Sequence, residues 1–184
     1  MTDLFTDERD VIAKRRVSLP TITVWQPWSL LLARGAKRLE TRHWPPPENL
    51  IGKEWAIHAA ARPPRASDCS PLERLAIEKA IGLPMEHWGT LARGAIVATA
   101  RLAGAYRASR LHDDHVDVGV RLPGSEKGLT SFVFMTGEAW FGDYRAGRWL
   151  WHFDNVHMLE VPIIQKGAQG IWTWSGELPI RDED

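Results

Sequence analysis

Lys37, Glu40 and Arg42 are the residues of this chain whose types and spacing are best suited to chemistry. They follow Gly35 in the stretch "RGAKRLETRHW". Side chains alternate across a strand, so Glu40 and Arg42 share a face, and Lys37 joins them only where the backbone is irregular. Arg42 could fork onto a phosphate or a base edge. Glu40 could orient Arg42 or accept from an exocyclic amine, and Lys37 could bind phosphate, or act as a base if burial lowers its pKa. The alternative for all three residues is solvated charge on a strand.

The segment before these residues, "WQPWSLLLARG", predicts a helix. Pro27 suits the first turn, and Gly35 is placed to cap the C-terminus. Free amides around Trp28 and Ser29 could then bind an anion, with the Ser29 hydroxyl beside them. The alternative is a plain helix end that Gln26 caps.

Aromatic residues surround the same segment. Trp25, Trp28 and Trp44 could form a stacking platform for a base, or they could pack inside the sheet. A second aromatic group alternates along one later segment and is predicted to belong to the core: Trp149, Trp151 and Phe153.

Three further motifs allow both a structural and a functional interpretation. His58 lies among apolar residues in "AIHAA", which is typical of a core histidine, and Arg62 follows it. "KGAQG", which begins at Lys166, predicts a hairpin connection or a close backbone approach to a ligand, with Lys166 on a phosphate. "HDDH", at 112–115, has the side chains of a metal cluster. Adjacent loop residues seldom converge on one ion without further ligands, so no metal site is predicted.

The elements that must position these residues are mostly strands. Ser70 and Glu73 form a capping box for the clearest helix, which has Pro71 at its first position and ends at Gly82. Strands are expected at about 21–24, 38–43, 53–59 and 95–106, and in "TSFVF", "WLWHFDNVHML" and "GIWTW". About six strands and two principal helices predict a mostly β, α+β fold. The preferred form is a small antiparallel barrel with helical insertions, and an open sheet is the alternative.

Domain organisation and composition narrow the function classes. Residues 1–18 are expected to be a flexible tail, and 19–184 one domain with a surface insertion at 108–128. The formal net charge is zero, so nonspecific electrostatic binding to the phosphates of nucleic acids is not expected. Duplex DNA is therefore not an expected partner. The lone Cys69 excludes an internal disulfide. The absence of a long apolar run or a secretion signal predicts a cytoplasmic protein that does not enter membranes.

Several spaced motifs resemble the ASCH domain family. Its pattern is roughly Q-P-aromatic, an apolar helix, and G-x-K-x-x-E-x-R, which this chain matches at Gln26, Pro27, Trp28, Gly35, Lys37, Glu40 and Arg42. The resemblance continues through "WAIHAAARP", "LARGAIVATARL", "FGDYRAGRWLW" and "LEVPIIQKGAQGIWTW". It implies a PUA-like β-barrel that binds RNA or nucleotides, and it places His58 near the pocket.

One branch of that family resembles small amidohydrolases that act on acetylated cytidine. The resemblance implies a lysine at Lys37, a threonine three residues later and a distant glutamate, which Glu138 could supply. Glu40 occupies the threonine position and Thr41 is one residue late, so the chain departs from the pattern. A lysine-activated hydroxyl would be a workable nucleophile.

The leading hypothesis is therefore a cleft that binds RNA, a nucleotide or a modified nucleoside without a cofactor. The alternative is a hydrolase of RNA or a modified nucleoside that uses Lys37 with Glu40 or Glu138. A third possibility is a protein contact through the 108–128 insertion. The predicted ligand-binding residues are Trp25, Gln26, Trp28, Ser29, Lys37, Glu40, Arg42, His58, Arg62 and Lys166.

Overall fold

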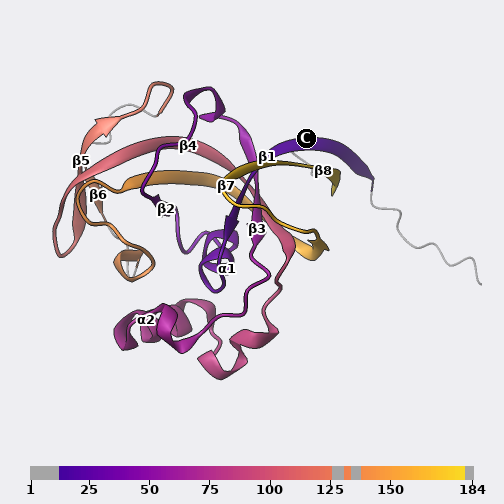
Figure 1. Cartoon of the computed structure of the whole chain (residues 1–184), viewed down its shortest axis with the longest axis horizontal. Coiled ribbons are helices and arrows are strands. Elements are labelled where there is room, and N and C mark those ends of the chain that lie inside the picture. Colours follow the sequence, from indigo (N-terminus) through magenta and orange to yellow (C-terminus); the bar gives the residue numbers. More distant parts are fainter. Residues whose placement is uncertain (1–12, 126–130, 134–137, 181–184) are drawn as a thin grey trace, which may run out of the picture.

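One large, curved sheet forms the body of the protein in the computed structural model, which describes residues 13–125, 131–133 and 138–180 (Figure 1). Its strands are β1 (Lys14–Val24), β2 (Leu39–Arg42), β3 (Glu54–Ala59), β4 (Ala95–Leu111), β5 (His115–Arg121), β6 (Ser131–Val133), β7 (Trp149–Ile164) and β8 (Ile171–Pro179). The helices are α1 (Trp28–Ala33) and α2 (Pro71–Ile81), with short 3₁₀ turns η1 (Glu48–Leu50), η2 (Ala66–Asp68), η3 (Met85–Thr90) and η4 (Glu138–Trp140). The mostly β prediction is confirmed.

The sheet is open. Its strand order is β2-β7-β4-β3-β1-β8, with β5 on β4 and β6 on β5. Every recorded pair is antiparallel except β1 with β3. The described residues form eight strands where about six are expected, and no pairing among these residues joins β2 to β8.

Strands β4 and β7 curve together through the whole sheet. Their ladder shifts register near Ala98, Arg101 and Gly104. Each such irregularity adds local bend and twist, so the long pair arches instead of lying flat (Figure 1).

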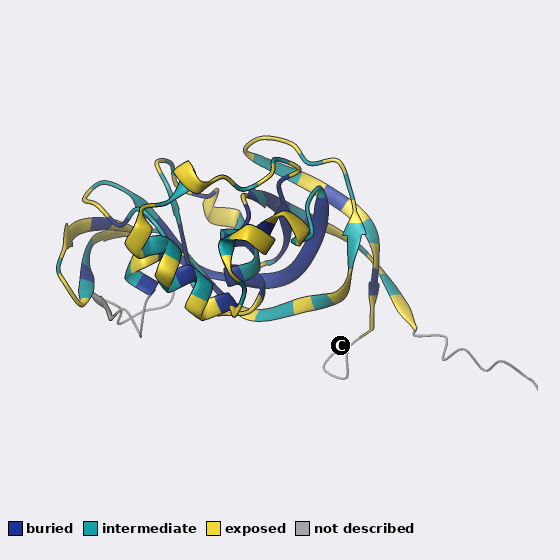
Figure 2. Cartoon of the chain, turned by 90° about the horizontal axis from the view of Figure 1, so that it is seen from below, coloured by how far each residue is buried: buried dark blue, intermediate teal, exposed yellow. Residues whose placement is uncertain are grey.

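Helix α1 lies on the concave side of that arch, and α2 lies beyond it. The helix α1 contacts β3, β4 and β7 on one side and α2 on the other. Leu32 belongs to the core cluster of the sheet, whereas Leu31 packs with Ile77 of α2. Burial is accordingly deepest where the sheet faces α1 (Figure 2). The predicted core residues Trp151 and Phe153 are fully buried, and Trp149 packs against them.

Two predicted boundaries change. Strand β1 begins at Lys14 and pairs with β8, so residues 14–18 are a strand and not part of a tail, whose remainder at 1–12 lies outside the described residues. Most of the predicted 108–128 insertion is the β4–β5 hairpin, in which Ala108 and Val116 are buried. Residues 126–128 lie outside the described residues. Among the described helices, none is long and apolar enough to cross a membrane.

Helix α2 has the capping box that the sequence predicts. The Ser70 hydroxyl accepts from the Glu73 amide at 3.3 Å, and the Glu73 carboxylate accepts from the Ser70 amide at 2.6 Å. Gly82 ends the helix at a φ of 64°, a left-handed conformation that suits glycine.

We expect Ser70→Ala to lower the free energy of unfolding by about 1 kcal/mol, because the helix loses a side-chain cap. Urea unfolding followed by circular dichroism measures this. Ser175→Ala is the control, since its exposed hydroxyl caps no described helix and lies 3.1 Å from the Ser18 hydroxyl. Equal effects of the two substitutions would show that the capping box contributes nothing.

Candidate functional site

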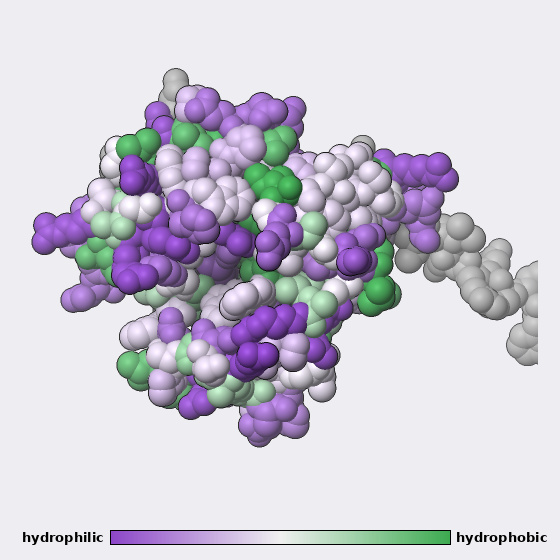
Figure 3. Space-filling model, viewed as in Figure 1, coloured by the Kyte–Doolittle hydropathy of each residue, from purple (hydrophilic) through white to green (hydrophobic). Residues whose placement is uncertain are grey.

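A cleft of about 430 Å³ opens between the sheet and the α2 layer. Figure 3 shows the surface hollowed there, with hydrophilic and hydrophobic residues side by side. The lining residues come from three separate parts of the chain: Thr23, Val24, Trp25, Trp28, Lys37, Glu40, Thr41, Arg42; Asp68, Glu73; Phe141, Gly142, Asp143 and Arg148. Five predicted site residues are thus together, namely Trp25, Trp28, Lys37, Glu40 and Arg42.

Lys37 lies at the base of the cleft and is almost wholly buried, with 1% of its surface exposed. Its Nζ donates to the Leu39 carbonyl, lies 3.6 Å from the Glu40 carboxylate and 5.6 Å from the centre of the Tyr144 ring. Burial lowers the pKa of Lys37, and the nearby carboxylates oppose that shift. The irregular backbone before β2 thus brings Lys37 to the same cleft as Glu40, as the chemical interpretation requires.

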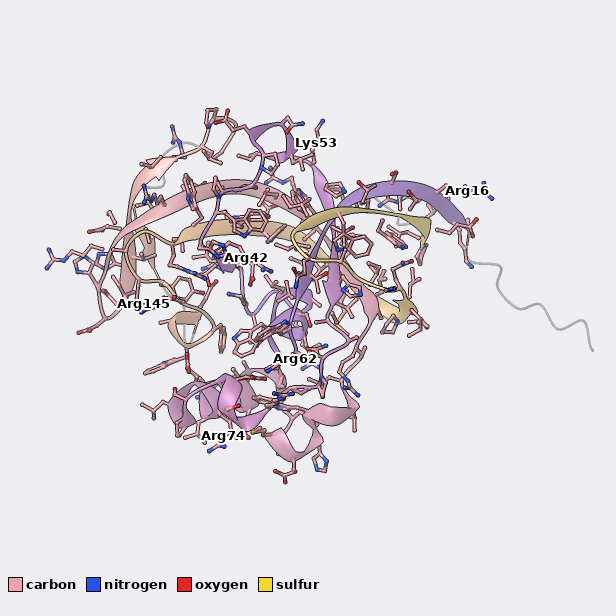
Figure 4. The ribbon with its side chains drawn as sticks, viewed as in Figure 1. Arg16, Arg42, Lys53, Arg62, Arg74 and Arg145 are labelled. Carbon is pink, nitrogen blue, oxygen red and sulfur yellow. The ribbon has the colours of Figure 1, made fainter. Side chains whose placement is uncertain are left out.

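Glu40 holds two cations at once. Its Oε2 faces Lys37, and its Oε1 lies 3.1 Å from Arg42 Nε. Arg42 also donates from Nη2 to the Thr23 carbonyl at 2.9 Å, which ties β2 to the end of β1. In Figure 4, Arg42 lies inside the arch of the sheet, far from Arg16 at the outer end of β1. Glu40 therefore orients Arg42, one of the two roles expected of it.

Trp25 provides the aromatic wall and is half exposed. The Arg62 guanidinium lies 4.1 Å from the centre of its ring. Arg62 is also held by two hydrogen bonds to Asp68, at 2.5 and 2.7 Å, which lower the pKa of that carboxyl. Arg62 does not line the cleft, and its predicted contact with a ligand stays a prediction. It supports Trp25.

The opposite wall was missed in the sequence. Gly142 approaches so closely that a Cβ added there would lie 3.0 Å from Lys37 Nζ and 3.2 Å from Thr41 Oγ1. The Asp143 amide donates to the Thr41 hydroxyl, and Arg148 donates to the Thr41 carbonyl. The crowded polar stretch "FGDYRAGR" was the available signal, but only the fold places it beside β2.

The predicted anion site at the start of α1 loses both of the contacts expected from Ser29. The Ser29 amide already donates to the Trp25 carbonyl, and the Ser29 side chain is fully buried away from the cleft. Gln26 caps the helix instead, since its Oε1 accepts from the Leu30 amide at 3.3 Å while its Nε2 donates to the Ala92 carbonyl. Gln26 and Ser29 are structural residues here.

His58 is a core histidine. Its Nε2 lies 2.9 Å from the Gln165 carbonyl, its ring packs edge-on against Trp172, and burial lowers its pKa. A Cβ on Gly167 would lie 2.3 Å from the His58 ring, so this glycine permits close approach to a histidine and not to a ligand. Lys166 is exposed and does not line the cleft. The fold therefore uses His58 in the core, and a phosphate contact by Lys166 would have to lie outside the cleft.

Two other candidates serve the scaffold. Glu138 is buried and accepts from the amides of Arg38 and Leu39 at 2.7 and 2.9 Å, and it does not line the cleft. Its carboxylate therefore positions β2, and the catalytic role considered for it stays a prediction. Trp44 packs edge-on against Trp151 at 4.8 Å and is not part of a stacking platform.

No family model matches this chain, and no curated protein matches it as a relative.

Burial of Lys37 makes a prediction about pH. A lysine with a lowered pKa in the folded state loses its proton before the unfolded chain does, so stability rises as the pH approaches the ordinary value of 10.5. The slope is at most about 1.4 kcal/mol per pH unit, the value for one whole proton. We expect the unfolding free energy of the wild type, relative to that of Lys37→Met, to increase between pH 7 and 10. Urea unfolding at each pH measures this difference. A constant difference would assign Lys37 an unshifted pKa.

Proposed function

We propose that the cleft binds a nucleobase, presented by a modified nucleoside, a nucleotide or single-stranded RNA. The observation that carries the proposal is a half-exposed tryptophan at the wall of a cleft whose floor is polar. Trp25 offers an aromatic face, and Glu40, Thr41 and Arg42 offer acceptors and donors for a base edge. Aromatic stacking combined with hydrogen bonds to the edge is the usual way in which proteins hold an unstacked base.

The charges of the cleft favour the base over the phosphate. Four carboxylates line it, Glu40, Asp68, Glu73 and Asp143, against three cations, Lys37, Arg42 and Arg148. Each cation lies within ion-pair distance of a carboxylate in the cleft. A phosphate gains little from such a lining, whereas an uncharged nucleoside does not suffer from it. We therefore place any phosphate outside the cleft.

The curved sheet and the position of α1 agree with the family resemblance. We interpret the arched sheet, with α1 on its concave side, as the PUA-like barrel of an ASCH domain, left open between β2 and β8. An RNA or nucleoside ligand would be consistent with the cytoplasmic location that the sequence predicts.

The second candidate function is hydrolysis of a modified nucleoside or of RNA. The buried Lys37, with its lowered pKa, favours it, because a neutral amine can accept a proton. Thr41 lines the same cleft although it is one residue late, and its Oγ1 and Lys37 Nζ both lie near Gly142. Lys37 would be the base, Thr41 the nucleophile, and Glu40 would orient the lysine.

The binding proposal is tested by isothermal titration calorimetry with cytidine, N4-acetylcytidine and cytidine 5′-monophosphate. We expect the monophosphate to bind no more tightly than the nucleoside. Trp25→Ala should weaken binding about 5- to 150-fold, since stacking on an aromatic residue contributes about 1–3 kcal/mol per base. Trp140→Ala is the matched control, because Trp140 is also exposed but does not line the cleft. Equal losses in both variants would contradict the proposed wall.

Titration with matched single- and double-stranded RNA at fixed salt tests the strand preference. We expect single strands to bind more tightly, because a duplex keeps its bases stacked and a neutral protein lacks the field to hold it. Tighter binding to the duplex would contradict a base-binding cleft.

Turnover is tested by chromatography of acetylated nucleosides and short RNAs after incubation with the protein. If the cleft is catalytic, we expect product with the wild type and a loss of at least a hundredfold in rate for Lys37→Met and Thr41→Val, consistent with removal of a base or a nucleophile. Ser175→Ala is the control. Binding without product would leave the first proposal and exclude the second for these substrates.

A further inference from the structure

The β4–β5 hairpin carries a cluster of metal-ligating side chains outside the cleft. His112, His115 and Asp117 each place one ligand atom within 4.8 Å of the others. His112 Nε2 lies 3.0 Å from Asp117 Oδ2, and His115 Nε2 lies 3.5 Å from Asp117 Oδ1. Ligands about 2.0–2.1 Å from a tetrahedral ion are separated by about 3.3 Å, so this spacing already approaches that of a bound ion.

Asp117 is the ligand that the sequence motif lacks. The "HDDH" motif alone does not predict a metal site, because neighbouring loop residues seldom converge on one ion without further ligands. In the structure the turn brings the two histidines together, since the His112 amide donates to the His115 carbonyl. Their rings lie parallel at 4.2 Å, and Asp117, from strand β5, faces the Nε2 atoms of both.

Asp114 adds an independent feature of metal sites. Its Oδ1 lies 2.6 Å from Nδ1 of His115, on the side of the ring away from Asp117. A carboxylate that accepts from one ring nitrogen keeps the proton there, so the lone pair of Nε2 is available to a metal. Neighbouring Asp113 is exposed and makes no such contact in the described part of the chain.

We propose that His112, His115 and Asp117 bind one divalent transition-metal ion of the zinc class, with Asp114 orienting His115. Two imidazoles and one carboxylate suit zinc, nickel, cobalt and copper better than magnesium or calcium, which prefer oxygen ligands. Three protein ligands leave room for water. None of the four residues lines the cleft, so this site does not depend on the proposed function.

A bound ion would stabilise the β4–β5 hairpin. His112 follows the end of β4, and Asp117 lies in β5 opposite Arg110, so the ligands span the turn that joins the two strands. Binding to the folded state alone raises stability by mass action. Zinc should therefore raise the melting temperature of the wild type and leave that of ligand variants unchanged.

The test is calorimetric titration of the full chain, free of any histidine tag, with ZnCl₂ and separately with MgCl₂. We expect one equivalent of zinc to bind and magnesium to give no heat. His115→Ala should abolish binding, whereas His87→Ala, a change at an exposed histidine outside the cluster, should preserve it. Far-UV circular dichroism checks that each variant is folded.

Asp114→Asn and Asp113→Asn form the matched pair, since each removes one negative charge from the same turn. We expect Asp114→Asn to weaken zinc binding about 10- to 100-fold, as loss of an orienting carboxylate does, and Asp113→Asn to leave it unchanged. Equal effects of the pair, or zinc binding that persists in His115→Ala, would overturn the proposal. So would the absence of a one-equivalent site in the wild type.

Discussion

Two backbone amides that share one buried carboxylate hold the cleft together. Glu138 Oε1 accepts from Arg38 and Leu39, and its Oε2 accepts from the Arg38 guanidinium. Hydrogen bonds to a charged acceptor contribute about 1.5–3 kcal/mol each, and a buried amide left without its acceptor is costly. Leu39 begins β2 directly after Arg38, and the residues that follow them, Glu40, Thr41 and Arg42, form one wall of the cleft. The opposite wall begins directly after η4, so the same carboxylate fixes the separation of the two walls.

Burial of the Lys37 ammonium group costs free energy, which this arrangement must offset. Taking an ammonium group out of water is unfavourable by several kcal/mol, and a single ion pair seldom recovers the whole cost. Glu40 recovers part of it, and the Leu39 carbonyl and the Tyr144 ring add further contacts. A scaffold could fill the same volume with methionine at lower cost. A buried lysine facing a polar cleft is therefore more typical of a functional site than of a structural one.

Local chemistry made much of the fold predictable, whereas contacts between distant segments were not. Ser70 and Glu73 predicted the start of α2, and alternation of large apolar residues predicted the buried strand through Trp151 and Phe153. The strand order depends on pairing between segments that are distant in the sequence, and the extension of β1 back to Lys14 and the wall at Gly142 join segments more than a hundred residues apart. Local periodicity carries no information about such contacts. The same reason explains the errors at the site. Ser29 and His58 have the right residue types, but the fold buries them, whereas the metal cluster needed Asp117 from the next strand.

For the base-binding function that we propose, selectivity in the cleft must come from shape and stacking, because the cations that line it are already paired with carboxylates. Lys37 and Arg42 share Glu40, Arg148 lies 3.5 Å from Asp143, and Arg62 is held by Asp68. What remains for a ligand is the aromatic surface of Trp25 and the edges of the polar groups around it. Arg62 covers part of that ring and Asp68 holds Arg62, so the indole is fixed before a ligand arrives. A fixed ring loses less conformational entropy on binding than a mobile one, so affinity can arise from a single stacked base.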